Sequence, residues 1–572
     1  MFRRSVVVSR EFSSRQTPVL HASRRLSSRS YTSAAADSQK QGPTGTPPWS
    51  GHALSFLLGS LGILGLSYYF LRPDPSSWNP QSLKVKYGSA NDFQTAVRVL
   101  CLTFPEDGVL HSVVVYPLCT EDVVKIVNIA TKYKMPIIPY SGGTSLEGHT
   151  RGHKYGGICV DMSRMDRILE INGEDSLIVA EILSRNTFFT EADADLVCQA
   201  GIRWVDINDT LKEKDIPLFF PEQRSAVWLA QAAQEHGLVA NAVRYGTAKG
   251  EWFLNLTVVL PSGKVIKTRR RARKSSAGFD TSKIFIGAEG TLGIVTEATL
   301  RLTPLLPTSV AVVHFPDVKH ATEAVRDALT QGVGIQCVEL CDDSFMHATN
   351  LYGLSKRKWP EKDSLFFKFQ GHSAEALRET ARVVKKVAER YGGTGFTLAR
   401  NDKEAADLWM DRKNAHFSGL ALVEGGRSWA TDVWWVFLSS VFADDVFLSQ
   451  SCLTWCMRRK KDLKEAGVIS SIVGHAGDGN FHAQLLFKDD SEMEKIREVV
   501  HRMVKRAIAL DGTCTGEHGV GLGKKAYLNE ELGEGTVELM KTIKRTLDPL
   551  GLFNPGKLYP DEPADSSSKS HS

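Results

Sequence analysis

Two short glycine-framed stretches near the C-terminal end concentrate side chains that can bind a metal or move a proton. They are Gly474-His-Ala-Gly-Asp-Gly-Asn-Phe-His482 and Gly516-Glu-His-Gly-Val-Gly521. Glycine carries no side chain and tolerates unusual backbone angles, so polar groups within such runs can converge. His475, His482 and Glu517 offer two imidazoles and one carboxylate, a set that suits a divalent metal with positions open for a substrate. His518, beside that carboxylate, is predicted to accept a proton.

Single histidines and glutamates in loops have a simpler interpretation. One such residue is usually solvated or hydrogen-bonded to its own backbone, and short motifs match by chance. Here four candidates occur together in two glycine-rich runs. Their joint occurrence favours a reactive site over the simpler interpretation.

The first 36 residues differ in charge from the rest of the chain. They contain seven arginines and one acidic residue, Glu11, and so carry a net charge of +6, whereas the whole chain carries +5. The remainder is therefore close to neutral at −1, which argues against a nucleic-acid-binding protein. An Arg- and Ser-rich, acid-poor start is typical of a mitochondrial presequence. We predict a presequence and linker over residues 1–45, with a disordered basic tail as the alternative.

An uncharged run of 19 residues, 53–71, follows the linker. As a helix it would extend about 28 Å, close to the hydrocarbon thickness of a bilayer. Tyr68 and Tyr69 lie where an interfacial aromatic belt would be. The alternative is a buried core helix. A transmembrane helix with its basic side toward the matrix would place the large domain in the intermembrane space.

A helix, a strand and a glycine-rich turn are predicted near residue 140. Residues 120–133 carry a capping Thr120, early acids and apolar residues at helical spacing. Residues 136–140 are predicted to form a short strand, and residues 141–148 the turn that leaves it. Such a turn exposes many backbone N–H groups, which a phosphate can bind. An ordinary tight turn is the alternative.

Two further segments lie in the same half of the chain. Residues 287–302 pass from a small-residue loop into a β-branched strand, where backbone can approach a planar ring closely. The basic run 269–274 has no interleaved aromatic residues, so we interpret it as a solvated loop.

After Pro304 the pattern changes to alternating strands and separate helices. The predicted strands are 309–315, 334–340 and 364–371, and the predicted helices are 317–330 and 374–391. This alternation indicates an α+β domain with an antiparallel sheet covered on one face. The polar tail, 560–572, is predicted to be disordered.

Five motifs, in this order, give the chain a family resemblance. They are residues 140–149, 287–295, 474–482, 516–521 and 552–557. With them, the region from Asn79 to Tyr559 resembles the FAD-dependent D-lactate and 2-hydroxy-acid dehydrogenases, flavoproteins of the vanillyl-alcohol-oxidase (PCMH) type. The resemblance implies an α+β fold with a two-part FAD-binding domain, 79–305, followed by a cap and metal-binding domain, 306–559.

The resemblance also implies roles for individual residues. FAD would contact Ser141, Gly142, Gly143, Thr144, Ser145, Gly148, Glu289, Gly290, Thr291 and Ile294. A divalent metal, zinc or manganese, would be bound by His475, His482 and Glu517. His518 would be the base and Arg412 would hold the substrate carboxylate, for which a planar guanidinium is suited. The implied partners are D-lactate, cytochrome c and the inner mitochondrial membrane, with no nucleic acid.

Three segments depart from the family pattern: 176–192, 222–240 and 434–459. The second replaces a Gly-rich flavin-contacting stretch with a sequence typical of an amphipathic helix. We hypothesise that the three are errors of gene prediction, because the family pattern resumes after each. Two other functions stay open on sequence alone, a D-2-hydroxyglutarate dehydrogenase and an inactive, FAD-free scaffold.

Overall fold

The computed structural model describes residues 111–141, 146–172, 194–220, 252–434, 460, 462–477 and 479–561. The predicted presequence and linker, the predicted span 53–71 and the predicted tail beyond Asp561 lie outside these ranges. So do segments 176–192 and 222–240, and segment 434–459 apart from Trp434. No helix within the described ranges has the length and apolarity needed to cross a bilayer.

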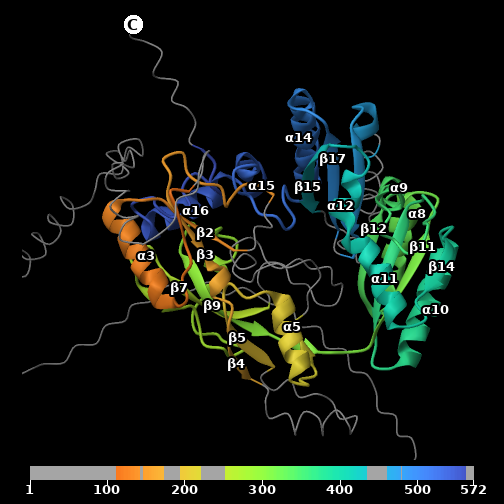
Figure 1. Ribbon diagram of the computed structural model, residues 1–572, viewed down its shortest axis with the longest axis horizontal. Helices are drawn as coiled ribbons and strands as arrows, with labels where there is room; N and C mark the ends of the chain where they lie inside the picture. Colours follow the sequence, from red (N-terminus) through yellow and green to blue (C-terminus); the bar gives the residue numbers. More distant parts are fainter. Residues whose placement is uncertain are drawn as a thin grey trace, which may run out of the picture. The chain divides into compact units, whose positions relative to one another are not determined.

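The first half of the described chain contains two main sheets and a separate two-stranded pair (Figure 1). The smaller main sheet is parallel, in the order β1–β3–β2, and comprises Val113–Val115, Ile158–Asp161 and Ile137–Tyr140. Helix α3, Thr120–Tyr133, connects β1 to β2 and confirms the predicted helix. Its predicted cap is wrong, because the N-cap is Cys119 and Thr120 is the first helical residue. The Thr120 hydroxyl instead donates to Thr296 Oγ1 at 2.9 Å.

The larger sheet of this half is antiparallel, in the order β4–β5–β9–β7–β8. Its strands are Ile168–Asn172, Asp195–Gln199, Ile294–Arg301, Phe253–Val259 and Val265–Lys267. The other elements are α5 (Trp204–Glu213), α7 (Ser282–Phe285) and the small pair β6 (Leu218–Phe219) and β10 (Thr303–Pro304). Strand β9 follows the loop 287–293, as predicted, and lies at the centre of the sheet. The basic run 269–274 forms a largely exposed loop.

The second half contains a seven-stranded sheet in the order β14–β11–β13–β12–β16–β17–β15. All its pairs are antiparallel, as predicted. In that order, its strands are Thr394–Leu398, Thr308–His314, Ser364–Gln370, Ile335–Cys341, Ile469–His475, Asn480–Phe487 and Arg427–Trp434. The helices are α8 (Val318–Thr330), α9 (Asp343–Tyr352), α10 (Ala374–Arg390), α11 (Asp402–Lys413), α12 (Ala415–Leu420), α14 (Met493–Ala509), α15 (Leu528–Leu532) and α16 (Glu534–Leu547).

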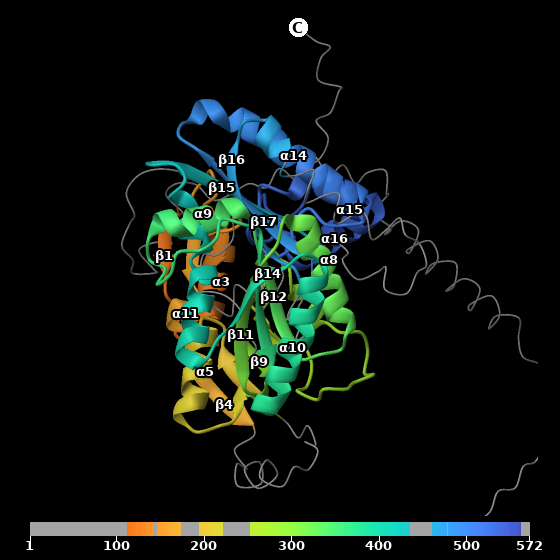
Figure 2. The same ribbon diagram turned by 90° about the vertical axis from the view of Figure 1, so that its right-hand side faces the viewer.

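Helices cover both faces of this sheet, which corrects the prediction of one covered face. One core contains residues of α8, α10 and α14, and the other contains residues of α9, α11 and α12. Alternate residues of one strand enter different cores, as Ala311 and Val312 do. Figure 2 shows α8 and α10 on one side of the strands and α9 and α11 on the other. A strand buried on both faces has apolar residues at consecutive positions, as β12 largely does.

The C-terminal segment returns to the first half of the chain. Ile137 N–H donates to Leu552 O, and Asn554 N–H donates to Ile137 O, both at 2.8 Å. Leu552 and Phe553 belong to the core of the two smaller sheets. Asn554 is fully buried with a φ of 40°, and its Nδ2 donates to His149 O at 3.0 Å and to Glu289 O at 2.7 Å. This one side chain therefore bonds both glycine-rich segments of the first half.

Replacing Asn554 tests this connection. We expect Asn554→Ala to lower the free energy of unfolding by about 2–4 kcal/mol, because two buried carbonyls lose their donors. Asn554→Gly loses the same hydrogen bonds but tolerates the positive φ, so it should be less destabilised, by about 1 kcal/mol. Thermal unfolding followed by circular dichroism measures both. Equal midpoints for the two variants would contradict the backbone contribution.

Candidate active site

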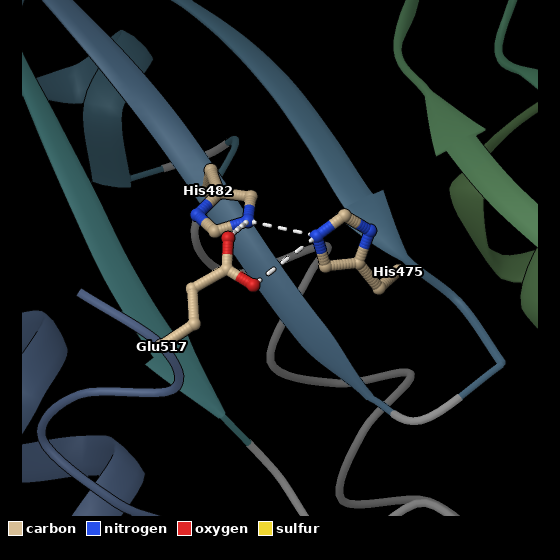
Figure 3. Close-up of side chains that lie close together, drawn as sticks. All are labelled: His475, His482 and Glu517. Carbon is tan, nitrogen blue, oxygen red and sulfur yellow. Dashed lines mark hydrogen bonds and ion pairs between the residues drawn. The ribbon is translucent and has the colours of Figure 1, made fainter. Parts of the chain in front are cut away.

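His475 and His482 face each other across the β16–β17 hairpin. His482 pairs with Val473 in the register, and His475 lies two residues beyond Val473 on the same strand. Directly opposed residues share a face of a sheet, as do residues two apart, so both imidazoles lie on one face. Their Nε2 atoms are 3.3 Å apart (Figure 3). Both side chains are buried.

Glu517 completes a compact donor set from the loop after α14. Its Oε1 lies 3.1 Å from His482 Nε2, and its Oε2 lies 3.5 Å from His475 Nε2. One ligand atom from each of the three buried residues lies within 4.8 Å of the others. Two imidazole nitrogens at about 2.1 Å from one tetrahedral ion would be about 3.4 Å apart. The spacing of the histidines therefore fits a shared cation.

Two further carboxylates lie behind the histidines. His475 Nδ1 is 3.0 Å from both oxygens of Glu339 on β12. His482 Nδ1 is 3.7 Å from Asp432 Oδ1 on β15. A carboxylate beside Nδ1 favours the proton on that nitrogen and leaves the Nε2 lone pair for a ligand. Both imidazoles are thus oriented with Nε2 toward Glu517.

Asp432 also holds the loop that carries Glu517. Its Oδ2 accepts from the backbone N–H of Glu517 at 2.6 Å and of His518 at 2.8 Å. It accepts a third hydrogen bond from Thr515 Oγ1 at 3.0 Å. Asp432 is fully buried, so these bonds are shielded from water. One carboxylate therefore fixes the backbone of the metal-ligand candidate and of the predicted base.

The buried charges of this cluster do not cancel among themselves. Burial by itself lowers the pKa of His475, but the carboxylates of Glu339 and Glu517 outweigh it and raise the pKa to about 9. Burial lowers the pKa of His482 to about 4. Burial opposes ionisation of Glu517, yet the two histidines hold its pKa well below the usual range. Three carboxylates surround the imidazoles, so positive charge is favoured between them.

Arg412 supplies one buried positive charge, beside Glu339. Its Nε and Nη2 donate to Glu339 Oε2 at 3.1 and 2.5 Å, and only 3% of its side chain is exposed. The guanidinium is therefore connected to His475 through Glu339. Its predicted contact with a substrate carboxylate stays a prediction.

His518 lies at the more open side of the cluster. Its side chain is 18% exposed, compared with 4% for Glu517. His518 Nε2 is 3.4 Å from Glu517 Oε1, and its ring centroid is 5.6 Å from that of His482. An imidazole here can reach a small molecule bound at the cluster. The structure brings together all four residues that the two glycine-framed stretches predicted.

The glycine-rich segments of the first half lie against each other. Gly290 has a φ of 69°, and a Cβ on it would lie 2.2 Å from Pro139 Cγ, so this close approach requires glycine. Ser141 Oγ is buried and has no hydrogen-bond partner among the described residues. An unpaired buried hydroxyl at the start of a glycine-rich turn fits an anionic ligand such as a pyrophosphate. Residues 142–145 lie outside the described ranges, and Gly148 has a φ of 76°.

The other predicted cofactor residues have definite partners. The Glu289 carboxylate accepts from the backbone N–H of Val520 and Gly521 at 2.5 and 2.9 Å. Thr291 Oγ1 donates to Ala288 O at 2.6 Å, and Ile294 is buried at the start of β9. The Glu289 carboxylate is thus engaged by the chain itself, and the predicted contact of this loop with FAD stays a prediction.

Sequence reasoning missed Glu339 and Asp432. Each lies inside a strand, and both side chains are fully buried. The available signal was an acidic residue in the otherwise mostly apolar stretch Ile335–Cys341, because a buried charge needs a partner. That signal indicates that the acidic residue has a partner, but it does not indicate which residue the partner is.

Comparison with known families identifies the chain. The family described as "FAD binding domain" matches residues 111–269, and the family described as "FAD linked oxidases, C-terminal domain" matches residues 307–558. The chain is 38% identical to the mitochondrial "D-lactate dehydrogenase [cytochrome]" of Kluyveromyces lactis, over 79% of this chain and 74% of that protein. It belongs to the FAD-linked oxidase family. The protein is accordingly an FAD-dependent oxidoreductase.

Other relatives extend this family assignment. The mitochondrial D-lactate dehydrogenase (cytochrome) of Arabidopsis thaliana is 38% identical over 79% of this chain and 74% of its own length. The glycolate oxidase subunit GlcD of Bacillus subtilis is 26% identical over 80% and 90%. Among solved structures, 4-ethylphenol oxidase from Gulosibacter chungangensis superposes with a TM-score of 0.61 at 17% identity, covering 83% of this chain and 98% of that one. This likeness confirms the predicted PCMH-type flavoprotein fold.

The buried Glu339–Arg412 pair provides a stability test. We expect Glu339→Gln to lower the free energy of unfolding by about 3–5 kcal/mol, because Arg412 keeps a buried charge without its bonded carboxylate. The double variant Glu339→Gln/Arg412→Met removes both charges, so it should lose less than the sum of the single variants. Thermal unfolding of the wild type, both single variants and the double variant completes the cycle. Strict additivity would contradict the ion pair.

Proposed function

We propose that this FAD-linked oxidase oxidises D-lactate to pyruvate and passes the electrons to cytochrome c. The support is the similarity over most of the chain to relatives whose names state D-lactate dehydrogenase (cytochrome). The observation that carries the proposal to chemistry is the buried set His475, His482 and Glu517, with His518 beside it. Oxidation of a 2-hydroxy acid removes the hydroxyl proton and a hydride from the same carbon, and this arrangement suits the first of these events.

A divalent cation, zinc or manganese, is proposed on His475, His482 and Glu517. Three supports are independent of the family: the 3.3 Å spacing of the Nε2 atoms, the carboxylates beside each Nδ1, and the surplus of buried negative charge. When bound, the cation lowers the pKa of a coordinated hydroxyl. Because the surrounding carboxylates raise the pKa of His475 to about 9, its imidazole carries a second proton, on Nε2, which binding of a metal there should release.

The remaining proposed roles follow from position. His518, at the open side of the cluster, accepts the hydroxyl proton. Arg412 orients the substrate carboxylate, with Glu339 holding the guanidinium in place. FAD is proposed to bind between two segments. The first is the turn from Ser141 to Gly148, and the second is the backbone of Glu289, Gly290 and Thr291. When bound, FAD supplies the acceptor for the hydride.

We also propose a mitochondrial location at the inner membrane, with the catalytic domain facing the intermembrane space. The supports are the arginine-rich start, the uncharged run 53–71 and the mitochondrial names of the relatives. Protease treatment of mitoplasts tests the orientation. Full protection of the C-terminal half would contradict it.

Turnover tests the proposed reaction directly. The purified protein should be yellow, and its flavin absorbance should bleach on adding D-lactate. We expect His518→Asn to lower kcat for D-lactate by about 100- to 10,000-fold, because the proton acceptor is lost, with flavin content unchanged.

The exposed His372 is a control, since His372→Asn should leave kcat unchanged. A His518→Asn variant with wild-type kcat would remove that residue from the mechanism. Faster reduction of cytochrome c with D-2-hydroxyglutarate than with D-lactate would contradict the substrate assignment.

Metal content tests the cation separately from activity. Wild-type protein should contain about one equivalent of zinc or manganese by inductively coupled plasma mass spectrometry, and His482→Ala should contain about a tenth of that or less. His314 is a buried histidine bonded to Ser364 outside the cluster, so His314→Ala should keep its metal. Equal metal content in the wild type and His482→Ala would contradict the proposed ligand set.

A further inference from the structure

The loop that carries Glu517 and His518 is held by two buried carboxylates, one at each end. At its start, Asp432 accepts from the consecutive N–H groups of Glu517 and His518. At its end, Glu289 accepts from the consecutive N–H groups of Val520 and Gly521. Asp432 belongs to the seven-stranded sheet, whereas Glu289 belongs to the glycine-rich loop before β9. The five residues 517–521 thus depend on both halves of the chain.

Glu147 and the C-terminal segment extend this attachment. The backbone O of Glu147, within the first glycine-rich turn, accepts from Leu522 and Gly523 N–H at 2.8 and 3.2 Å. Leu558 N–H donates to Gly521 O at 2.9 Å. A Cβ on Gly521 would lie 2.3 Å from Glu147 O, so the loop packs directly on that backbone. These contacts leave the loop little freedom to shift.

Glutamate at position 289 destabilises the fold unless its carboxylate is hydrogen-bonded. It is fully buried and has a φ of 51°, which a non-glycine residue rarely adopts. Burial raises the pKa of its carboxyl group to about 7 even though two backbone N–H groups stabilise the charged form. Burial and strain both cost stability. The hydrogen bonds to Val520 and Gly521 offset part of this cost.

We propose that Glu289 is a positioning residue, which fixes Glu517 and His518 from the FAD-binding half through the amides of Val520 and Gly521. The inference rests on the proposed function for the meaning of Glu517 and His518. Val520 is three residues from Glu517 and two from His518, so movement of one end of this short loop moves both side chains. The geometry of the metal and base residues therefore depends on the loop that is proposed to contact FAD.

Glu289→Gln provides the test. The side-chain amide can accept one of the two N–H groups, but its own NH2 faces the other, so one buried donor is left unpaired. We expect amide hydrogen exchange of the segment 516–524 in the FAD-loaded protein to become about 10-fold faster. We expect affinity for Zn²⁺, titrated alone against a chromophoric chelator, to fall about 10- to 100-fold.

Val325→Ala is the matched control. Val325 is a buried apolar residue of α8, so its truncation lowers stability without removing a hydrogen bond of the loop 517–521. It should leave both the exchange of 516–524 and the Zn²⁺ affinity unchanged.

In the Glu289→Gln enzyme, kcat for D-lactate should fall more than KM rises, because the substituted group acts on the catalytic side chains.

The outcomes separate this inference from the proposed function. Unchanged exchange of 516–524 in Glu289→Gln would overturn the positioning role, whatever the activity. Equal effects of Glu289→Gln and Val325→Ala would also overturn it, since they would indicate general destabilisation. If the wild type binds no Zn²⁺ but Glu289→Gln still accelerates exchange, the positioning role stands and the proposed metal fails.

Discussion

The burial of negative charge around two imidazoles is the constraint on which the site depends. Glu339, Asp432 and Glu517 are all buried beside His475 and His482, and isolated carboxylates in such surroundings are strongly unfavourable. Each carboxylate is therefore bonded to a specific partner, which fixes ring orientation, loop backbone and the position of Arg412 together. Loss of any one bond affects several groups, because the charges share the same partners.

The fold meets this constraint by placing the acids on separate elements. Glu339, His475, His482 and Asp432 come from β12, β16, β17 and β15, consecutive strands of one sheet. Backbone hydrogen bonds hold neighbouring strands about 4.8 Å apart, so the side chains have little choice of position. Helices on both faces exclude water from the sheet. Glu517 and His518 lie on a loop instead, and bonds from both halves of the chain compensate for the absence of a regular element.

Local sequence was informative where the physics is local. The helix 120–133 and the strands near 309, 334 and 364 could be predicted because apolar periodicity and turn residues act over a few positions. The capping role of Thr120 failed because its hydroxyl bonds to Thr296, far along the chain. The prediction that helices cover only one face of the sheet was wrong, because burial of a strand on both sides depends on how the layers pack. The return of Leu552 to the strand at Ile137 likewise has no local signal.

By itself, the sequence determined which residues could do the chemistry: two histidines, a glutamate and a third histidine framed by glycines. It also determined the family, through ordered motifs. Only the tertiary structure decided that Glu339 and Asp432 orient the imidazoles, that Arg412 is bonded to Glu339, and that Glu289 reaches the loop of Glu517. The physical reason is that a charge's partner is set by distance in space, and these partners lie between 50 and 232 positions apart along the chain.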